Sequence, residues 1–128
     1  MPHSAPTLAL LALAGAVGTL SRFGLSGIVL WICGKGFPWG TLVVNPLGCL
    51  LFGLIAPQIE SRLDLNPQTR LILLTGFLGA FTTFSTFAFE SAEQLQKSAW
   101  LPAMANIMGQ NALGIACIFA GMALARSR

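Results

Sequence analysis

The sequence predicts an all-α integral membrane protein with four transmembrane helices. Of its 128 residues, 55% are hydrophobic and only 9% are charged, whereas soluble domains carry about 25% charged residues. The mean hydropathy of +0.76 agrees with this. Four apolar segments are each long enough to cross a bilayer core, which takes roughly 20 residues, and short connections separate them. We therefore expect one transmembrane domain over residues 1–128, placed in the plasma membrane as a multi-pass protein.

The first apolar segment runs from Thr7 to Cys33 and contains one charge, Arg22. A cleaved signal peptide has lysine or arginine before its apolar stretch, and none precedes this segment. We therefore expect a retained helix. A charge at membrane depth is expensive and points to a functional role. Arg22 either lines a vestibule that attracts anions or marks the place where the helix leaves the apolar layer.

The second segment runs from Thr41 to Ile59 and contains an amide, Asn45, among apolar residues. A buried amide needs hydrogen-bond partners. Asn45 either joins two helices or donates its N–H groups to an anion. Pro46 follows it and predicts a kink, because proline removes a backbone donor.

The third segment, from Leu71 to Phe89, has the most unusual composition. Gly76 and Gly79 lie near its middle. Four hydroxyl residues occupy five positions after them: Thr82, Thr83, Ser85 and Thr86. Four phenylalanines recur at spacings of four and three, which places them on one face of a regular helix: Phe77, Phe81, Phe84 and Phe87.

Two interpretations of this third segment stay open. Small residues and hydroxyls are typical of a close-packed face between membrane helices. The same residues also suit a helix that is broken near its middle, since non-helical backbone survives at membrane depth only inside protein or beside water. Carbonyls released at such a break can bind a cation, and positively polarised ring edges can support a small anion.

The fourth segment runs from Trp100 to Ala125 and contains three amides, Asn106, Gln110 and Asn111. Asn111 and Gly114 lie about one helical turn apart. This pattern predicts a closely packed helix face with amides directed inward. Both helix packing and pore lining are consistent with it.

The charges specify the orientation of the chain only weakly. An even number of helices places both termini on one side, with Arg62, Arg70, Arg126 and Arg128, while Lys35 and Lys97 lie on the other. Basic residues favour the cytoplasmic side, and four against two is a small excess. The chain either has one poorly specified orientation or inserts both ways and pairs with itself. Glu90 is a possible partner of Arg22.

Taken together, these segments resemble the Fluc family of small fluoride channels, also called the CrcB family. The resemblance covers nearly the whole chain. It is carried by Arg22, by Gly40–Asn45 with the following Gly48, by Thr75–Phe87, and by Asn111–Gly114. The Thr75–Phe87 segment is long and specific.

The resemblance implies a passive, fluoride-selective channel that exports fluoride to relieve toxicity. It implies an antiparallel, dual-topology homodimer with two pores, so the partners are a second copy, the lipid bilayer and fluoride. It also implies a structural sodium ion held by the backbone carbonyls of Gly79 and Thr82. The family's pore residues correspond to Phe84, Phe87, Asn45, Ser85, Thr86 and Asn111.

Three positions depart from the family pattern. Pro46 stands where an aliphatic residue is usual, and Ala80 where glycine is common. Ile115 replaces a hydroxyl residue that often follows the helix-four glycine. This last departure weakens the expectation of a polar track on the fourth helix.

The main competing function is a small, dual-topology, proton-coupled multidrug exporter. Such a carrier needs a carboxylate inside the membrane, whereas the acids of this chain fall at the ends of predicted helices: Glu60, Asp64, Glu90 and Glu93. A non-transporting assembly subunit would explain the glycines but not the clustered hydroxyls and rings. No acid–base pair, metal cluster or nucleophile motif suggests an enzyme. The scattered basic residues argue against nucleic-acid binding.

Overall fold

The computed structural model describes residues 4–61 and 66–127, and all regular structure in these two ranges is helical. The elements, in chain order, are α1 (Ala5–Cys33), α2 (Trp39–Ser61), α3 (Pro67–Arg70), η1 (Leu71–Leu78), α4 (Gly79–Phe81), α5 (Phe84–Gln96) and α6 (Trp100–Arg126). Of the residues that we predicted to matter, Arg62, Asp64 and Arg128 lie outside these ranges.

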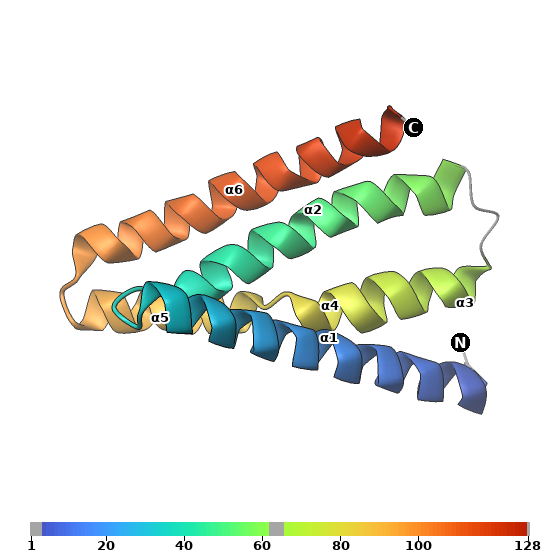
Figure 1. The fold of residues 1–128 in the computed structure, drawn as a ribbon, viewed down its shortest axis with the longest axis horizontal. Coiled ribbons are helices and arrows are strands. Elements are labelled where there is room, and N and C mark those ends of the chain that lie inside the picture. Colours follow the sequence, from blue (N-terminus) through green and yellow to red (C-terminus); the bar gives the residue numbers. More distant parts are fainter. Residues whose placement is uncertain (1–3, 62–65, 128) are drawn as a thin grey trace.

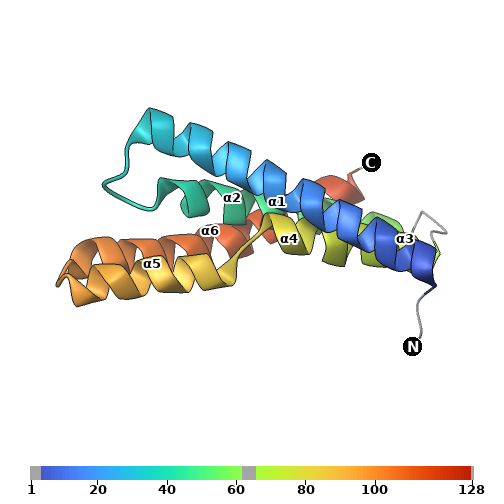
Figure 2. The same cartoon turned by 90° about the horizontal axis from the view of Figure 1, so that it is seen from below.

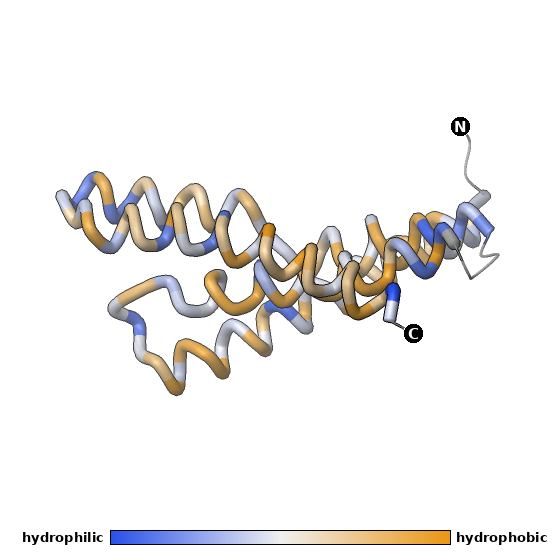
Figure 3. Tube along the Cα trace, turned by 90° about the horizontal axis from the view of Figure 1, so that it is seen from above, coloured by the Kyte–Doolittle hydropathy of each residue, from blue (hydrophilic) through white to orange (hydrophobic). Residues whose placement is uncertain are grey.

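The four predicted membrane spans are confirmed in this described part of the chain. The spans are α1, α2, the run from Pro67 to Gln96, and α6, and each is long and apolar enough to cross a bilayer. Successive spans run in opposite directions. The start of α1 and the end of α6 therefore lie at the same end of the bundle (Figure 1). Apolar residues run along all four spans (Figure 3).

The observed spans are longer than the predicted ones at several ends. The third begins at Pro67 rather than Leu71, because Asn66 caps it by accepting a hydrogen bond from the Thr69 N–H at 2.9 Å. The same span continues to Gln96 rather than Phe89. The α2 helix also continues through Pro46 and Pro57.

Glycines set how closely the helices approach one another. The most extensive contact is between α2 and α6, which lie side by side (Figure 1). A β-carbon on Gly53 would overlap the backbone of Ile118, and one on Gly121 would overlap the backbone of Leu50. The α1 helix packs on the third span in the same way, since a β-carbon on Gly18 would overlap the Phe77 carbonyl.

Much of the apolar surface faces outward. Phe23 is 79% exposed and Trp31 is 85% exposed on α1, while the buried cluster between α2 and η1 is small and centres on Ile59, Leu74 and Leu78. In lipid an outward-facing ring or leucine side chain carries no solvation penalty, because lipid tails are as apolar as a protein core. The side-chain arrangement is thus that of a membrane bundle.

The third span changes its helical form along its length. Residues Leu71–Leu78 form a wide π-helix, and the α-helix ends at Phe81. Thr82 (φ −90°, ψ 160°) and Thr83 (φ −150°, ψ 113°) are extended, and α5 begins at Phe84. Figure 2 shows the non-helical stretch of chain between α4 and α5.

We predict that Gly53→Ala destabilises the fold. Its new methyl group would have to displace the Ile118 backbone, and overpacking of this kind costs about 1–3 kcal/mol. The measurement is an unfolding titration of the purified protein in detergent. Gly109→Ala is the matched control, because its β-carbon would meet only the Leu42 side chain at 3.6 Å. Equal stability of the two variants would contradict the close-approach argument.

Candidate functional site

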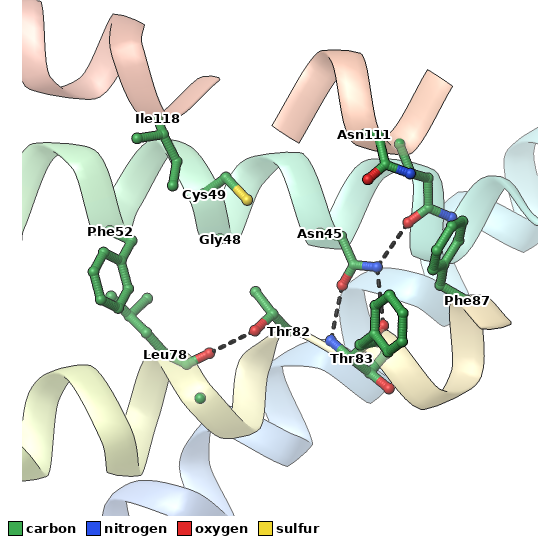
Figure 4. A pocket seen from close by; sticks show the side chains of 13 residues that line it. Asn45, Gly48, Cys49, Phe52, Leu78, Thr82, Thr83, Phe87, Asn111 and Ile118 are labelled. Atoms are coloured by element: carbon green, nitrogen blue, oxygen red, sulfur yellow. Dashed lines mark hydrogen bonds between the residues drawn. The ribbon is translucent and has the colours of Figure 1, made fainter. Parts of the chain in front are cut away.

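Asn45 on α2 holds the extended segment between α4 and α5. Its Oδ1 accepts from the Thr83 N–H at 2.8 Å, and its Nδ2 donates to the Thr83 carbonyl at 3.0 Å. The second N–H of the same amide donates to Gln110 Oε1 on α6 at 2.7 Å. Figure 4 shows these bonds, which join α2 to α6 and to the extended segment. The side chain therefore replaces the helical acceptor of the Thr83 N–H and gives the Thr83 carbonyl a further donor.

The diverted bonds release two particular carbonyls. In an α-helix the Thr83 N–H would donate to the Gly79 carbonyl and the Thr86 N–H to the Thr82 carbonyl. Here the Thr83 N–H donates to Asn45, and the Thr86 N–H donates to Thr83 Oγ1 at 3.2 Å. Gly79 and Thr82 are the two residues that the family resemblance implies as sodium ligands. Their carbonyl oxygens lose their helical donors and are hard ligands of the type that sodium prefers, so these residues fit the ion.

An open groove of about 360 Å³ lies beside this segment. Its walls come from α2, from α6 and from the chain on both sides of Thr82–Thr83, and the predicted residues that line it are Asn45, Gly79, Thr82, Phe84, Phe87 and Asn111. The rings of Phe84 and Phe87 have centroids 5.6 Å apart and planes inclined by 58°. Phe84 is 77% exposed, whereas Phe87 is 8% exposed. One ring is therefore fixed by packing, and the other stands free at the rim.

Arg22 lines a second pocket, of about 280 Å³, with Thr86 and Glu90. Its Nε donates to the Ala80 carbonyl at 3.2 Å, in the last helical turn before the extended segment. The arginine is thus half-buried against the third span. Thr83 lines both this pocket and the groove, so the extended segment separates the two.

The predicted pairing of Arg22 with Glu90 is wrong. The ion pairs among the described residues are Arg70–Glu60 at 2.8 Å and Lys97–Glu93 at 3.5 Å. Glu90 instead accepts from Thr41 Oγ1 at 2.6 Å. Glu90 also lies within α5 rather than at a helix end, because α5 continues to Gln96.

The four phenylalanines do not share one helix face, because the extended residues interrupt the helical spacing. Phe77 and Phe81 stack on each other with centroids 6.0 Å apart, before the interruption. Phe81 is buried against Gly48, whose added β-carbon would approach its ring. Of the four rings, the groove includes those of Phe84 and Phe87.

The remaining predicted residues lie in different places. Thr86 accepts from Thr83 Oγ1 at 3.0 Å and faces the second pocket. Ser85 lies 3.4 Å from Thr83 Oγ1, measured between the hydroxyl oxygens, and lines neither cavity. Asn111 donates to the Ile107 carbonyl of its own helix at 2.7 Å and lines the groove.

Sequence reasoning missed the importance of Gln110. This buried amide accepts from Asn45 and donates to Thr41 Oγ1 at 3.1 Å and to Asn106 Oδ1 at 2.9 Å. Asn106 in turn donates to Ser91 Oγ at 3.0 Å. The signal was present, because Asn106 and Gln110 lie four residues apart in an apolar segment and therefore share a helix face.

Comparison with known proteins identifies close relatives. The family model described as "CrcB-like protein, Camphor Resistance (CrcB)" matches residues 9–122. A "Fluoride-specific ion channel FluC" from Nitrosococcus oceani is 56% identical over 93% of this chain and 95% of its own length. Proteins of the same name from Solidesulfovibrio magneticus and Maridesulfovibrio salexigens are 54% and 48% identical, over 93% and 91% of this chain and 95% and 92% of their own lengths.

We predict that Asn45→Leu destabilises the protein strongly. The substitution removes the Asn45 partner of both Thr83 backbone groups and of the Gln110 oxygen. Each buried polar group left without a hydrogen bond lowers the free energy of unfolding by about 1–3 kcal/mol. Chemical unfolding in detergent measures the loss. Asn111→Leu is the matched control, since that amide is exposed and bonds only within its helix, and its effect should stay within about 0.5 kcal/mol. Similar losses in both variants would show that Asn45 does not hold the segment.

Proposed function

The chain belongs to the family of CrcB-like proteins, and from that membership we propose that it is a fluoride-selective, passive ion channel that exports fluoride and so relieves its toxicity. The relatives named as fluoride-specific channels match it over more than nine-tenths of its length. The chain is a multi-pass membrane protein, which in bacteria lies in the plasma membrane, and it is not an enzyme.

The observation that carries this proposal is the groove beside the extended segment. The α5 helix begins at Phe84, at the edge of the groove, and a helix N-terminus presents unpaired N–H groups and a partial positive charge. The rings of Phe84 and Phe87 add weakly positive edges. A dehydrated fluoride ion needs such donors in place of water, without a cation that would trap it.

The other predicted residues have different tasks in this proposal. Arg22 raises the anion concentration in the second pocket, which the groove meets at Thr83. Thr86 in the second pocket and Asn111 in the groove supply further polar groups along the path, whereas Ser85, which lines neither cavity, has no such task here. The amide of Asn45 mainly shapes the path, since its two N–H groups are used within the protein.

We also propose that the third span is broken in the working channel and that two chains assemble antiparallel, with two pores. The carbonyls of Gly79 and Thr82 would hold a structural sodium ion, which supplies fixed positive charge where two copies meet. Two carbonyls are fewer than a hard cation ordinarily takes, so a second copy would supply an equal pair. The sequence predicts four basic residues on one side (Arg62, Arg70, Arg126 and Arg128) and two on the other (Lys35 and Lys97), and so small an excess suits insertion both ways.

The exporter hypothesis is not favoured. The close relatives are named as fluoride channels. Glu60 and Glu93 form ion pairs in the described structure. Glu90, the acid placed deepest, accepts a hydrogen bond from Thr41. An assembly subunit without transport would leave the groove and the second pocket without a role.

We predict passive fluoride efflux that excludes chloride. Liposomes that contain the purified protein and are loaded with fluoride should empty when a potassium ionophore dissipates the opposing potential, because the donors of the groove suit a small anion. A fluoride electrode measures the release, and protein-free liposomes are the control. Equal release of chloride, or a requirement for a proton gradient, would contradict a selective channel.

We predict that Phe84→Ile and Phe87→Ile reduce fluoride efflux at least tenfold. Each substitution keeps apolar bulk but removes the ring edge, and a loss of about 1.4 kcal/mol in stabilisation of the ion corresponds to tenfold in rate. Efflux per folded protein is compared with that of Phe89→Ile, an exposed ring on α5 that lines neither the groove nor the second pocket. If both groove variants fold and conduct like the parent, the rings are packing residues only.

A further inference from the structure

Four hydrogen bonds connect the extended segment to Glu90, and all four run in one direction. The Thr83 N–H donates to Asn45 Oδ1 at 2.8 Å, and Asn45 Nδ2 donates to Gln110 Oε1 at 2.7 Å. Gln110 Nε2 donates to Thr41 Oγ1 at 3.1 Å, and Thr41 Oγ1 donates to Glu90 Oε2 at 2.6 Å. The chain of bonds thus begins in the groove and ends at a carboxylate that lines the second pocket.

Gln110 is the link that gives this chain its direction. Its oxygen is taken by Asn45, and its nitrogen donates to both Thr41 and Asn106. If the Gln110 amide were reversed, its N–H groups would face those of Asn45, and its oxygen would face the Asn106 oxygen. Gln110 is only 6% exposed, so water cannot replace the lost partners. One orientation of the amide is therefore strongly preferred.

The direction of the Gln110 amide supports the way in which Asn45 faces Thr83. With Gln110 Oε1 in place, Asn45 directs its nitrogen to Gln110 and to the Thr83 carbonyl, which leaves its oxygen for the Thr83 N–H. That last bond keeps the Thr83 N–H away from the Gly79 carbonyl. Bonds aligned in one direction polarise one another in a low-dielectric interior, so the acceptor at Glu90 strengthens the links before it.

We propose that Gln110 is a positioning residue for the anion path. Gln110 also lines the groove, but its Nε2 already donates to Thr41 and Asn106, so it acts through Asn45 rather than by donating to the ion. It reinforces the orientation of the Asn45 amide that Thr83 also requires, and thereby helps to keep the Thr82–Thr83 segment extended beside the groove. The link to conduction rests on the proposed function, whereas the link to the backbone at Thr83 does not.

The chain offers a matched control in Asn106. This amide is completely buried and lies four residues before Gln110 on the same helix. It donates to Ser91, whose hydroxyl donates to the Phe87 carbonyl at 2.8 Å, so it forms a side branch that leads away from Asn45. Loss of the Asn106 amide removes a buried polar group of the same kind and one acceptor of Gln110 Nε2, but it leaves the Thr41 acceptor and the Asn45 contact in place.

The first measurement is amide hydrogen exchange of the full-length protein, resolved at Thr83, for Gln110→Leu and Asn106→Leu. Gln110→Leu should accelerate exchange of the Thr83 N–H roughly threefold to tenfold, the change expected for a weakened internal hydrogen bond. Asn106→Leu should accelerate exchange near Ser91 and leave Thr83 within about twofold. If Gln110→Leu does not fold, Thr41→Val interrupts the same chain one bond further on, with the same expectation at Thr83.

The second measurement is fluoride efflux per folded protein. Gln110→Leu should lower it at least about threefold, and Asn106→Leu should lower it less. Unchanged exchange at Thr83 in Gln110→Leu, or an equal rise in Asn106→Leu, would overturn the positioning role. Faster exchange with unaltered efflux would overturn its connection to conduction. Absence of fluoride efflux in the parent protein would instead refute the proposed function, and the exchange result would still decide the role of Gln110.

Discussion

The hydrogen bonds between Asn45 and Thr83 are the constraint on which the rest of the site depends. A bilayer offers no water to unpaired backbone groups, and each such group costs several kcal/mol. Two consecutive residues can leave the helical conformation at this depth because one amide side chain bonds both the N–H and the carbonyl of Thr83. The place where α5 begins, the positions of Phe84 and Phe87, and the release of the Gly79 carbonyl all follow from it.

The surrounding bundle makes this arrangement rigid by means that differ from those of a soluble protein. Its apolar cluster is small, and large rings on α1 face outward. Close approach at glycines instead brings backbones within contact distance, as at Gly53 and Gly121 between α2 and α6. This approach brings Asn45 on α2 near Gln110 on α6. Close packing at small residues thus allows the amides to form hydrogen bonds between helices, and both interactions are common between membrane helices.

The interruption also has an electrostatic consequence. The run from Pro67 ends at Phe81, where carbonyls lose their helical donors, and α5 starts three residues later with its N–H groups. Negative and positive helix ends therefore lie close together. A cation site and an anion path can therefore lie side by side. The carbonyl end at Phe81 attracts a cation, and the N–H end of α5 attracts an anion. The proposed anion path and the proposed sodium site both depend on this single feature.

The sequence by itself determined the membrane fold, since span length and polarity depend on local composition. Its motif in residues 75–87 also indicated the family to which the chain belongs. Sequence could not reveal that Glu90 bonds Thr41 rather than Arg22, or that Gln110 joins Asn45 to Thr41. Those partners lie 49 to 69 positions apart, and only the packing of α2, α5 and α6 decides which of several possible donors reaches each acceptor. The four phenylalanines show the same limit, because a regular helical period fails where a distant amide has drawn the backbone out of the helix.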